Sequence, residues 1–482
     1  MKLSDILDGI KTVSSTGTTD IEISGISFDS RTCRRGYLFV AVNGTEADGH
    51  KYIGKAVENG AVAVIYEDGE VSVEGAACIK VESSRKALGL AASNFYGKPS
   101  EQLYLVGITG TNGKSTTVTL LYELFTRLGY CCGLFSTIAN YVGNEKLPAD
   151  HTTPDPVQLN SLLAEMVRRG CQYCFMEVSS HSLSQDRVAG LRFKGGIFSN
   201  LTHDHLDYHK TFTEYLRCKK LLFDNLPSDA FALTNVDDRN GEIMIQNTKA
   251  EIKTYSCSRP ADFKAKIIEE NLDGMELEID GSRLWCNFIG AHNAYNLLAV
   301  YSTAIMLGAD KEEVLVAMST LHTVAGRLEF FRGRNDVTAF VDYAHTPDGL
   351  ENVLKTLRET ARDRMLICLF GCGGDRDRTK RPEMGRIAGK YADRIIVTSD
   401  NPRTEDPMAI IDDIKAGMDI PTKSKAIFIT DRKEAIRTAV VTAPEGAVIL
   451  FAGKGHEDYQ VIGKEKLPYD ERNYVKEIIK GL

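Results

Sequence analysis

The sequence lacks the features expected of membrane-spanning, secreted and nucleic-acid-binding proteins. No stretch approaches the about 18 uninterrupted apolar residues that a membrane-spanning helix needs. The first eight residues already contain acidic side chains and lead into no long apolar run, so we expect neither a signal peptide nor a membrane anchor. The formal net charge of -8 disfavours a nucleic-acid partner, because such binding needs a basic surface. These absences predict a cytoplasmic protein with no membrane insertion and no nucleic-acid partner.

Cysteine usage indicates reduced thiols and not a disulfide framework. The 11 cysteines are odd in number and scattered along the chain. Cys171 and Cys174 have CxxC spacing, but no second pair follows them, and the segment continues into an apolar strand. We therefore expect a structural role for this pair.

A chain of 482 residues is too long for one hydrophobic core, and its pattern predicts an α/β protein of three domains. Residues 1–99 alternate short β-like runs with glycine turns and end in a linker-like stretch, "NFYGKPS". Over residues 100–326, apolar strands alternate with helices, which predicts a parallel sheet covered on both faces, with short antiparallel strands over 250–290. Residues 327–482 repeat the alternation, which predicts a separate, Rossmann-like sheet.

A glycine-rich loop follows the first strand of the central domain, in "YLVGITGTNGKSTT". Backbone N–H groups of such a loop, with the positive end of the following helix, hold phosphate oxygens. Lys114 would add a charge on the phosphates, and the Ser115 hydroxyl suits Mg²⁺. The spacing departs from GxxxxGK[ST], since Ile108 stands at the usual first glycine. The strand before, the helix after and the GKS ending favour nucleotide binding over a turn that is glycine-rich for packing.

Candidate metal ligands follow two later strands of the same domain. Glu177 ends the run "YCFME", at the carboxyl edge where ligands bind in α/β sheets. The segment "NLTHDHLDYH" adds His203, Asp204, His205, Asp207 and His209. Its histidine spacing is compatible with zinc, but carboxylates and an imidazole near a phosphate loop serve Mg²⁺ equally well. We expect Mg²⁺ with ATP, with zinc and a solvated polar loop as the alternatives.

The motifs of this chain resemble, in order, those of the Mur ligase family. They are "TGTNGKST", "MEVSSH", "LTHDHLDYH", "GAHNAYN", "GR" at 326–327, "DYAHTPD", "GCGGDRDRTKRP", "SDNPRTEDP" and "GKGHE". The resemblance covers essentially the whole chain. It departs from the family pattern at His203, where the family usually has Arg, and at Lys210, where it usually has Gly.

The resemblance implies an ATP-dependent amide ligase of class 6.3.2 that acts in peptidoglycan precursor synthesis, and so in cell-wall biogenesis, cell shape and cell division. ATP would phosphorylate the carboxylate of UDP-N-acetylmuramoyl-L-Ala-D-Glu, and an amine would attack the acyl phosphate. Dense positive charge is needed to bring the two anions together. The implied catalytic residues are Lys114, Glu177, His205 and Lys219, and the implied Mg²⁺ ligands are Ser115, Glu177, His205 and Lys219.

The resemblance implies that Lys219 is chemically modified. In the family, the first lysine of the K-x-x-L pattern, here in "YLRCKKLLF", is carbamylated by CO₂. Carbamylation converts an ammonium into a carboxylate-like metal ligand, and it requires a neutral amine and hence a lysine of lowered pKa. An ordinary helix-surface lysine is the alternative.

The same resemblance assigns the substrate contacts. It implies a UDP-sugar-binding domain over 1–99, a central ATP-binding domain over 100–326 and an amino-acid-binding domain over 327–482. The implied ATP contacts are Gly110, Thr111, Asn112, Gly113, Lys114, Ser115, Thr116, Asn293, Asn296, Arg327 and Asp342. The implied UDP-sugar contacts are Ser30, with Arg31 beside it in "FDSR", and Thr152, Thr153, Ser179, Gln185 and Arg187.

The "DNPR" tetrapeptide resembles the signature of family members that take meso-diaminopimelate. Arg403 could grip the second carboxylate of diaminopimelate through two parallel hydrogen bonds, and it would repel the bare ammonium of lysine. The implied amino-acid contacts are Arg376, Asp400, Asn401, Pro402, Arg403, Gly453 and Glu457.

Several alternatives remain at this point. They are the same ligation with L-lysine, a folylpolyglutamate synthetase, and a non-catalytic sensor of the sugar-nucleotide. Arg403 disfavours the first, and the domain before the phosphate loop disfavours the second. The retained set of charged motif residues argues against the third, and a motor or transporter ATPase is disfavoured because no membrane segment is expected.

Overall fold

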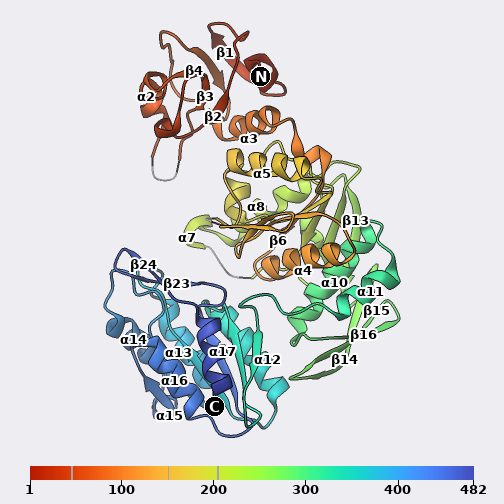
Figure 1. Cartoon of the computed structure of the whole chain (residues 1–482), viewed down its shortest axis with the longest axis vertical. Helices are drawn as coiled ribbons and strands as arrows, with labels where there is room; N and C mark the ends of the chain where they lie inside the picture. The colour runs from red at the N-terminus through yellow and green to blue at the C-terminus, as the bar shows by residue number, and fades with distance from the viewer. Residues whose placement is uncertain (45–46, 150, 203–205, 482) are drawn as a thin grey trace. The chain divides into compact units, whose positions relative to one another are not determined.

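The structure, a computed structural model, describes residues 1–44, 47–149, 151–202 and 206–481 (Figure 1). The chain forms two compact units. The first contains Met1–Lys264 and Asn296–Ala317, and the second contains Ala265–Tyr295 and Met318–Leu482. Within the described ranges, no helix is both long enough and apolar enough to cross a membrane.

A small sheet near the N-terminus has strand order β1-β5-β4-β3-β2. Its elements are α1 (Leu3–Ile6), β1 (Thr12–Thr16), β2 (Gly25–Ser27), β3 (Tyr37–Val40), α2 (Ile53–Glu58), β4 (Ala61–Tyr66), β5 (Ala77–Val81) and α3 (Ser84–Phe95). Alternate residues of a strand point to opposite faces. Leu38 and Ile65 accordingly pack with Leu88 of α3, while Phe39 and Val64 share the other cluster with α2. The linker expected over 94–100 is partly helical, since α3 continues to Phe95 and a 3-10 turn begins at Pro99.

The central sheet of the first unit places its phosphate-loop strand in the middle. The order runs β13-β12-β11-β6-β10-β7-β8-β9. Its strands are β6 (Tyr104–Thr109), β7 (Cys132–Phe135), β8 (Asn140–Val142), β9 (Glu145–Leu147), β10 (Tyr173–Glu177), β11 (Gly195–Phe198), β12 (Phe231–Asn235) and β13 (Glu251–Ser256). Its helices are α4 (Lys114–Arg127), α5 (Pro156–Arg168), α6 (Ser180–Ser184), α7 (Leu206–His209), α8 (Phe212–Asp224), α9 (Gly241–Met244), α10 (Ala291–Met306) and α11 (Lys311–Ser319), of which α10 begins in the second unit.

The strands from β13 to β7 are parallel, as expected, and β8 and β9 add an antiparallel edge. Cys174 lies in β10 and is fully buried, which agrees with a structural role. The prediction of antiparallel strands over 250–290 is correct for β14 (Phe263–Asn271), β15 (Gly274–Ile279) and β16 (Ser282–Cys286). It is wrong for β13, which runs parallel to β12. The connection through α9 is long enough to return the chain to the same edge, as parallel pairing requires.

The second unit contains a doubly wound sheet of order β17-β18-β22-β19-β20-β21. The strands are β17 (Glu329–Arg332), β18 (Thr338–Asp342), β19 (Leu366–Phe370), β20 (Arg394–Val397), β21 (Ala426–Phe428) and β22 (Val448–Ala452), with a hairpin of β23 (Tyr459–Ile462) and β24 (Glu465–Pro468). The helices are α12 (Pro347–Ala361), α13 (Lys380–Tyr391), α14 (Pro407–Ala416), α15 (Ile420–Ser424), α16 (Arg432–Val441) and α17 (Glu471–Gly481).

Two hydrophobic clusters cover the faces of this sheet. Phe340 and Leu450 pack with α12 and α13 on one face, and Val341 and Phe451 pack with α16 and α17 on the other. The strands are therefore buried on both sides, and polar groups gather where β18, β20 and β22 end.

Candidate functional site

The predicted phosphate loop lies between β6 and the N-terminus of α4. Gly110 has φ of 150° and Gly113 has φ of 86°, which are conformations that favour glycine. A Cβ on Gly110 would lie 1.9 Å from Oγ of Ser199, so the backbone there is as close as glycine allows. Lys114 folds back over the loop, and its Nζ donates to the carbonyl oxygens of Gly110 at 2.9 Å and Thr111 at 2.8 Å. This is a glycine-rich loop at a helix N-terminus, the geometry that binds phosphate.

Two residues that the sequence did not single out hold this loop in place. Ser199 and Asn200 follow β11, the strand beside β6. Ser199 donates through Oγ to the carbonyl of Asn112 at 2.6 Å. The side-chain oxygen of Asn200 accepts from the backbone N–H of Asn112 at 2.9 Å. The backbone carbonyl of Asn200 accepts from the backbone N–H of Thr111 at 2.8 Å. Only their position after an apolar strand could have indicated them.

Lys219 lies against the same loop. It is on α8, its side chain is 1% exposed, and its Nζ donates to the carbonyl oxygen of Gly110 at 2.7 Å. Two lysine amines therefore converge on one oxygen, since Lys114 donates to it as well. Tyr215, one turn earlier on α8, places its ring 4.7 Å from the Lys219 amine. The structure thus brings together two of the predicted catalytic residues.

Glu177 ends β10, next to β6, and is 1% exposed. Its carboxylate accepts from the backbone N–H of Thr137 at 2.7 Å and from the hydroxyl of Thr137 at 3.3 Å. Ser115, another predicted ligand in this unit, is also buried. A buried carboxylate beside a phosphate loop has the donor chemistry that Mg²⁺ prefers.

The histidine-rich segment is described only in part. His203, Asp204 and His205 lie outside the described residues. His209 is buried, and its Nε2 is 2.9 Å from Oγ of Ser180. Among the side chains that the structure describes, no group of three or more His, Cys, Asp or Glu residues could hold a metal ion. Lys210, where the family usually has glycine, has φ of 62°, the left-handed conformation that glycine favours.

The predicted UDP-sugar residues of the central domain form a connected group near Glu177. Thr153 donates through its hydroxyl to the carbonyl of Glu177 at 2.8 Å, and Thr152 accepts from Thr137 at 3.0 Å. Arg187 donates to the carbonyl of Thr153 at 3.0 Å and to Oε1 of Gln185 at 2.9 Å. Burial lowers the pKa of Arg187 below its ordinary value. The fifth residue, Ser179, caps α6 and donates its backbone N–H to the Thr153 hydroxyl at 3.3 Å.

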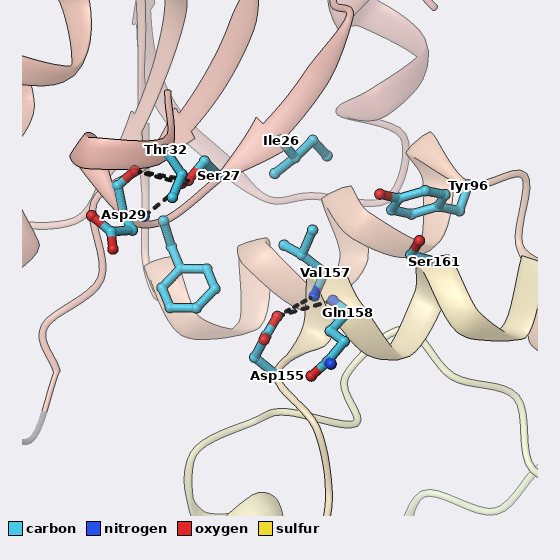
Figure 2. A pocket seen from close by; sticks show the side chains of 10 residues that line it. Ile26, Ser27, Asp29, Thr32, Tyr96, Asp155, Val157, Gln158 and Ser161 are labelled. Carbon is cyan, nitrogen blue, oxygen red and sulfur yellow. Dashed lines mark hydrogen bonds between the residues drawn. The ribbon is translucent and has the colours of Figure 1, made fainter. Parts of the chain in front are cut away.

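A cavity of about 400 Å³ lies between the "FDSR" segment and the start of α5 (Figure 2). It is lined by Ile26, Ser27, Phe28, Asp29, Thr32, Tyr96, Asp155, Val157, Gln158 and Ser161. Ser30 itself is buried and does not line it. Arg31 turns toward Asp29, with 2.7 Å between Nη2 and Oδ2. Local sequence could not show that Asp155, the last residue of "HTTPD", shares a cavity with "FDSR".

The predicted adenosine residues divide between the two units. In the first unit, Oδ1 of Asn296 accepts from the Thr117 hydroxyl at 3.5 Å. The same oxygen packs against the phosphate loop, because a Cβ on Gly113 would lie only 2.5 Å from it. In the second, Asn293 donates to the carbonyl of Ile289 at 2.9 Å. Arg327 stacks over the ring of Tyr343 at 4.9 Å.

Asp342, the last predicted adenosine residue, ends β18 in the second unit. Its carboxylate accepts from the backbone N–H groups of Leu328 and Ala344, both at 2.8 Å. Burial raises its pKa, although the charge of Arg327 opposes the rise. The carboxylate therefore ties the backbone that follows β18 to the residue that precedes β17.

The predicted amino-acid residues gather at the carboxyl edge of the second-unit sheet. Arg403 has φ of 51°, and its Nη1 donates to the carbonyl of Gly374 at 2.9 Å. Its backbone N–H donates to Val461 of the hairpin at 3.1 Å, which fixes the loop. Arg376 is exposed on the neighbouring loop, where Nη1 donates to the carbonyl of Asp375 at 3.1 Å. The two arginines thus lie on facing loops that follow β20 and β19.

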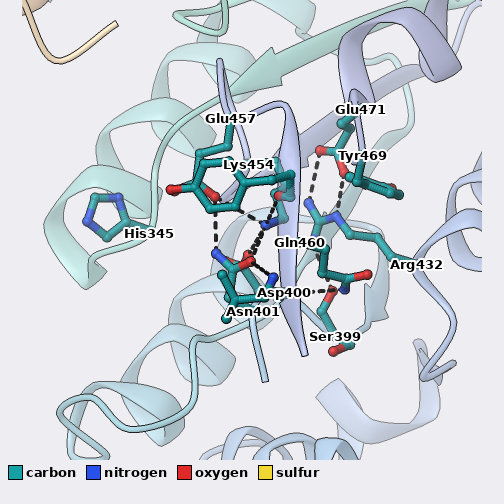
Figure 3. A network of polar contacts seen from close by, with 12 residues as sticks. His345, Ser399, Asp400, Asn401, Arg432, Lys454, Glu457, Gln460, Tyr469 and Glu471 are labelled. Atoms are coloured by element: carbon teal, nitrogen blue, oxygen red, sulfur yellow. Dashed lines mark hydrogen bonds and ion pairs between the residues drawn. The ribbon is translucent and has the colours of Figure 1, made fainter. Parts of the chain in front are cut away.

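Asp400, Asn401 and Glu457 are joined by a lysine that the sequence did not single out, Lys454 (Figure 3). Gly453, beside it, has φ of 113°, and a Cβ there would lie 3.1 Å from Oδ2 of Asp400. Pro402 approaches Gly374 so closely that a Cβ on that glycine would lie 1.9 Å from the proline carbonyl. These contacts hold the "DNPR" and "GKGHE" loops together.

A buried ion pair lies beneath the same loops (Figure 3). Arg432, the first residue of α16, pairs with Glu471, the first residue of α17, and both side chains are at most 1% exposed. Arg432 also donates to the carbonyl of Ala452 at 2.9 Å and to that of Ser399 at 3.3 Å. The pair therefore anchors the ends of the segments that carry Asp400 and Gly453.

Comparison with known proteins agrees with this geometry. Three family models match the chain: Mur ligase family, catalytic domain, over residues 22–96; Mur ligase middle domain, over 108–304; and Mur ligase, glutamate ligase domain, over 326–455. A UDP-N-acetylmuramoyl-L-alanyl-D-glutamate--2,6-diaminopimelate ligase of Cytophaga hutchinsonii is 51% identical, over 100% of both chains. The enzyme of the same name from Bacteroides fragilis is 52% identical over 99% of each.

Solved structures give the same result for the fold. A structure of a UDP-N-acetylmuramoyl-L-alanyl-D-glutamate--2,6-diaminopimelate ligase superposes with a TM-score of 0.73 at 32% identity, covering 99% of this chain and 98% of that one. A Mycobacterium tuberculosis folylpolyglutamate synthase has a TM-score of 0.60 at 18% identity and covers 76% of this chain and 92% of its own, which shows a shared fold alone. The predicted α/β class with three domains is confirmed. The chain therefore belongs to the Mur ligase family.

Proposed function

We propose that the chain is an ATP-dependent ligase that adds meso-2,6-diaminopimelate to UDP-N-acetylmuramoyl-L-Ala-D-Glu. The observation that carries the substrate choice is Arg403, held at the carboxyl edge of the second-unit sheet by Gly374 and Val461. The full-length relatives at 51% and 52% identity carry the name of this activity. The setting would be the bacterial cytoplasm, where such precursors are made.

The reaction has two steps. The γ-phosphoryl group of ATP passes to the substrate carboxylate, which gives an acyl phosphate and ADP. The amine of diaminopimelate then attacks the acyl carbon, and phosphate leaves as the amide forms. The first step brings two anions together, so it depends on positive charge placed in advance. Lys114 and the N-terminus of α4 would hold the phosphates in this scheme, because the backbone N–H groups of Thr111 and Asn112 already donate to Asn200.

Mg²⁺ would neutralise phosphate charge when bound, and the donor set suits it. Among the described residues, Thr137 donates to the buried carboxylate of Glu177, and a carboxylate has further lone pairs for a cation. Ser115 would contribute its hydroxyl, and His205 is the third proposed ligand. We retain Mg²⁺ over zinc because Glu177 and Ser115 are hard oxygen donors, although His205 would bind through nitrogen.

Lys219 would complete the metal site as a carbamate. Its amine is buried and shares the Gly110 carbonyl with Lys114, and two like charges so close together favour a neutral form of one of them. A neutral amine attacks CO₂, and loss of one proton leaves the carbamate. Activity measured with CO₂ and bicarbonate removed, then restored, tests this step. Lys219→Ala should be inactive under both conditions. Carbamylation would be contradicted if the wild-type rate did not change when bicarbonate is removed and mass spectrometry also found no CO₂ adduct.

The other proposed contacts divide by ligand. The connected group of Thr152, Thr153, Ser179, Gln185 and Arg187 would hold the sugar-nucleotide, with its uridine end in the cavity beside Ser30. Asn293, Asn296, Arg327 and Asp342 would contact adenosine. We keep the domain boundaries at residues 99 and 326 as part of this proposal.

Phosphate release by the purified chain tests the function. We expect release only when ATP, Mg²⁺, the sugar-nucleotide and meso-diaminopimelate are all present, with a product whose mass increases by diaminopimelate less water. Turnover with L-lysine alone would replace the proposed substrate. Binding of the sugar-nucleotide without phosphate release, whichever amine is supplied, would indicate the non-catalytic sensor.

A further inference from the structure

Lys454 is a fully buried charged side chain that the proposed reaction does not use. It belongs to "GKGHE", and its side chain is 0% exposed. Its Nζ donates to Oδ1 of Asn401 at 2.6 Å, to the carbonyl of Tyr459 at 2.9 Å and to Oε2 of Glu457 at 3.1 Å. It also lies 3.1 Å from Oδ1 of Asp400. A buried ammonium is costly unless it is paired and hydrogen-bonded, and here each of these four partners belongs to or borders the proposed amino-acid site.

The lysine determines which way the amide of Asn401 faces. An ammonium donates and cannot accept, so it requires the amide oxygen on its side. The backbone N–H of Val461 donates to the same oxygen at 2.9 Å, which gives the same orientation. The amide nitrogen therefore points the other way, where it donates to Oε2 of Glu457 at 3.1 Å. Asn401 presents donors on that side, as a substrate carboxylate requires.

Lys454 also sets the charge of the site. Asp400 and Glu457 together carry two negative charges, and Lys454 compensates one of them. Burial alone would raise the pKa of Asp400, but the charges of Lys454 and Arg432 outweigh it, and the pKa lies below its ordinary value. One net negative charge suits one ammonium of the incoming amino acid. Two net negative charges would attract an ammonium more strongly and would repel a carboxylate.

We propose that Lys454 is a positioning and specificity-determining residue: it orients Asn401 and halves the negative charge of Asp400 and Glu457, so that the site accepts an amino acid with a carboxylate beside its distal ammonium. The inference rests on the proposed function. It assigns selectivity to a pair, in which Arg403 attracts the distal carboxylate and Lys454 stops the two acids from repelling it.

Competition between meso-diaminopimelate and L-lysine tests the inference, with both products resolved by mass. For Lys454→Met, we expect kcat/KM for diaminopimelate to fall about 100-fold and that for lysine by much less, so that the selectivity ratio falls at least about tenfold. KM for ATP should stay within about twofold. Lys454→Arg keeps the charge and should keep the ratio within about threefold, whatever its overall rate.

Lys390→Met is the matched control. Lys390 pairs with Glu351 at 2.9 Å on the outer surface of the same unit, so its loss should leave both the ratio and the rate unchanged. Equal losses for both amino acids in Lys454→Met, or an unchanged ratio, would overturn the inference and leave the lysine a purely structural role.

Two further outcomes are distinguishable. If the wild-type chain makes no diaminopimelate product, the proposed function fails before any variant is compared. If Lys454→Met shows no cooperative unfolding transition, Asn401→Asp carries the test, because it keeps the lysine but replaces the oriented donor with a third acid. Its ratio should move toward lysine as well, and a ratio equal to that of the wild type would overturn the inference.

Discussion

Replacing Arg403 with alanine is the sharpest test of the proposed substrate choice. The Gly374 carbonyl accepts a hydrogen bond from Nη1 of the Arg403 guanidinium. The Nε–Nη2 edge is the side that can bind a carboxylate through two hydrogen bonds. Hydrogen bonds to charged groups contribute about 1.5–3 kcal/mol each. Losing the pair should therefore cost on the order of 3 kcal/mol, which corresponds to about 150-fold in kcat/KM for diaminopimelate.

The fold should survive this substitution. Arg403 has φ of 51°, a left-handed conformation that costs free energy for any residue with a Cβ. Alanine and arginine both have one, so the substitution adds no backbone strain. The assay is initial-rate phosphate release with diaminopimelate and ATP varied in turn. KM for ATP should change by less than about twofold, and Arg403→Lys should fall between wild type and alanine because it keeps the charge without the fork.

Arg378→Ala provides the control for this experiment. Arg378 is 69% exposed and pairs with Glu405 at 2.9 Å on the neighbouring loop, so its loss should leave diaminopimelate use unchanged. The reasoning is refuted if Arg403→Ala weakens ATP and diaminopimelate equally, or if its KM for diaminopimelate equals that of the wild type.

Three further substitutions test the chemistry, the loop and the pH dependence. Lys114→Ala should abolish phosphate release while thermal unfolding stays cooperative, and measurable turnover would contradict the role of this lysine. Gly110→Ala should destabilise the chain by about 1–3 kcal/mol and weaken ATP binding, since its Cβ would lie 1.9 Å from Ser199 Oγ; denaturant unfolding and a nucleotide titration measure the two effects. Hydrogen bonds from Arg381 hold the pKa of Glu405 at about 2, below its ordinary value of 4.5, so their stabilisation is complete above pH 4.5 and is lost as the pH falls toward 2. Unfolding of Glu405→Gln should accordingly depend less on pH across that window, and an identical dependence would exclude this carboxylate as its source.

The sequence predicted the parts of the site that depend on local pattern. The apolar run before Gly110 and the GKS ending predicted the strand, the loop and the start of α4, and the structure has all three. Glu177 was expected at a strand end, and it ends β10. Such predictions succeed because strand burial and helix starts are properties of a short stretch of chain.

The residues that were missed act through contacts between distant segments. Ser199 and Asn200 bond the backbone of a loop about 90 positions earlier, as the separation of 87 for Ser199 and Asn112 illustrates. Lys454 lies in a glycine-rich motif, where a lysine is ordinarily expected to be exposed, and only the tertiary structure shows its burial. The predicted antiparallel pairing of β13 was wrong for a similar reason. Residue pattern alone does not show which edge of a sheet a strand joins.

The pair formed by Arg432 and Glu471 has a practical consequence for anyone shortening or tagging this chain. A truncation that removes α17 would leave a buried guanidinium without its carboxylate, and breaking such a pair costs about 3–5 kcal/mol. Because Arg432 also holds the carbonyls of Ser399 and Ala452, the damage would reach the loops proposed to select the amino acid. An affinity tag is therefore better appended after the last helix than substituted for it.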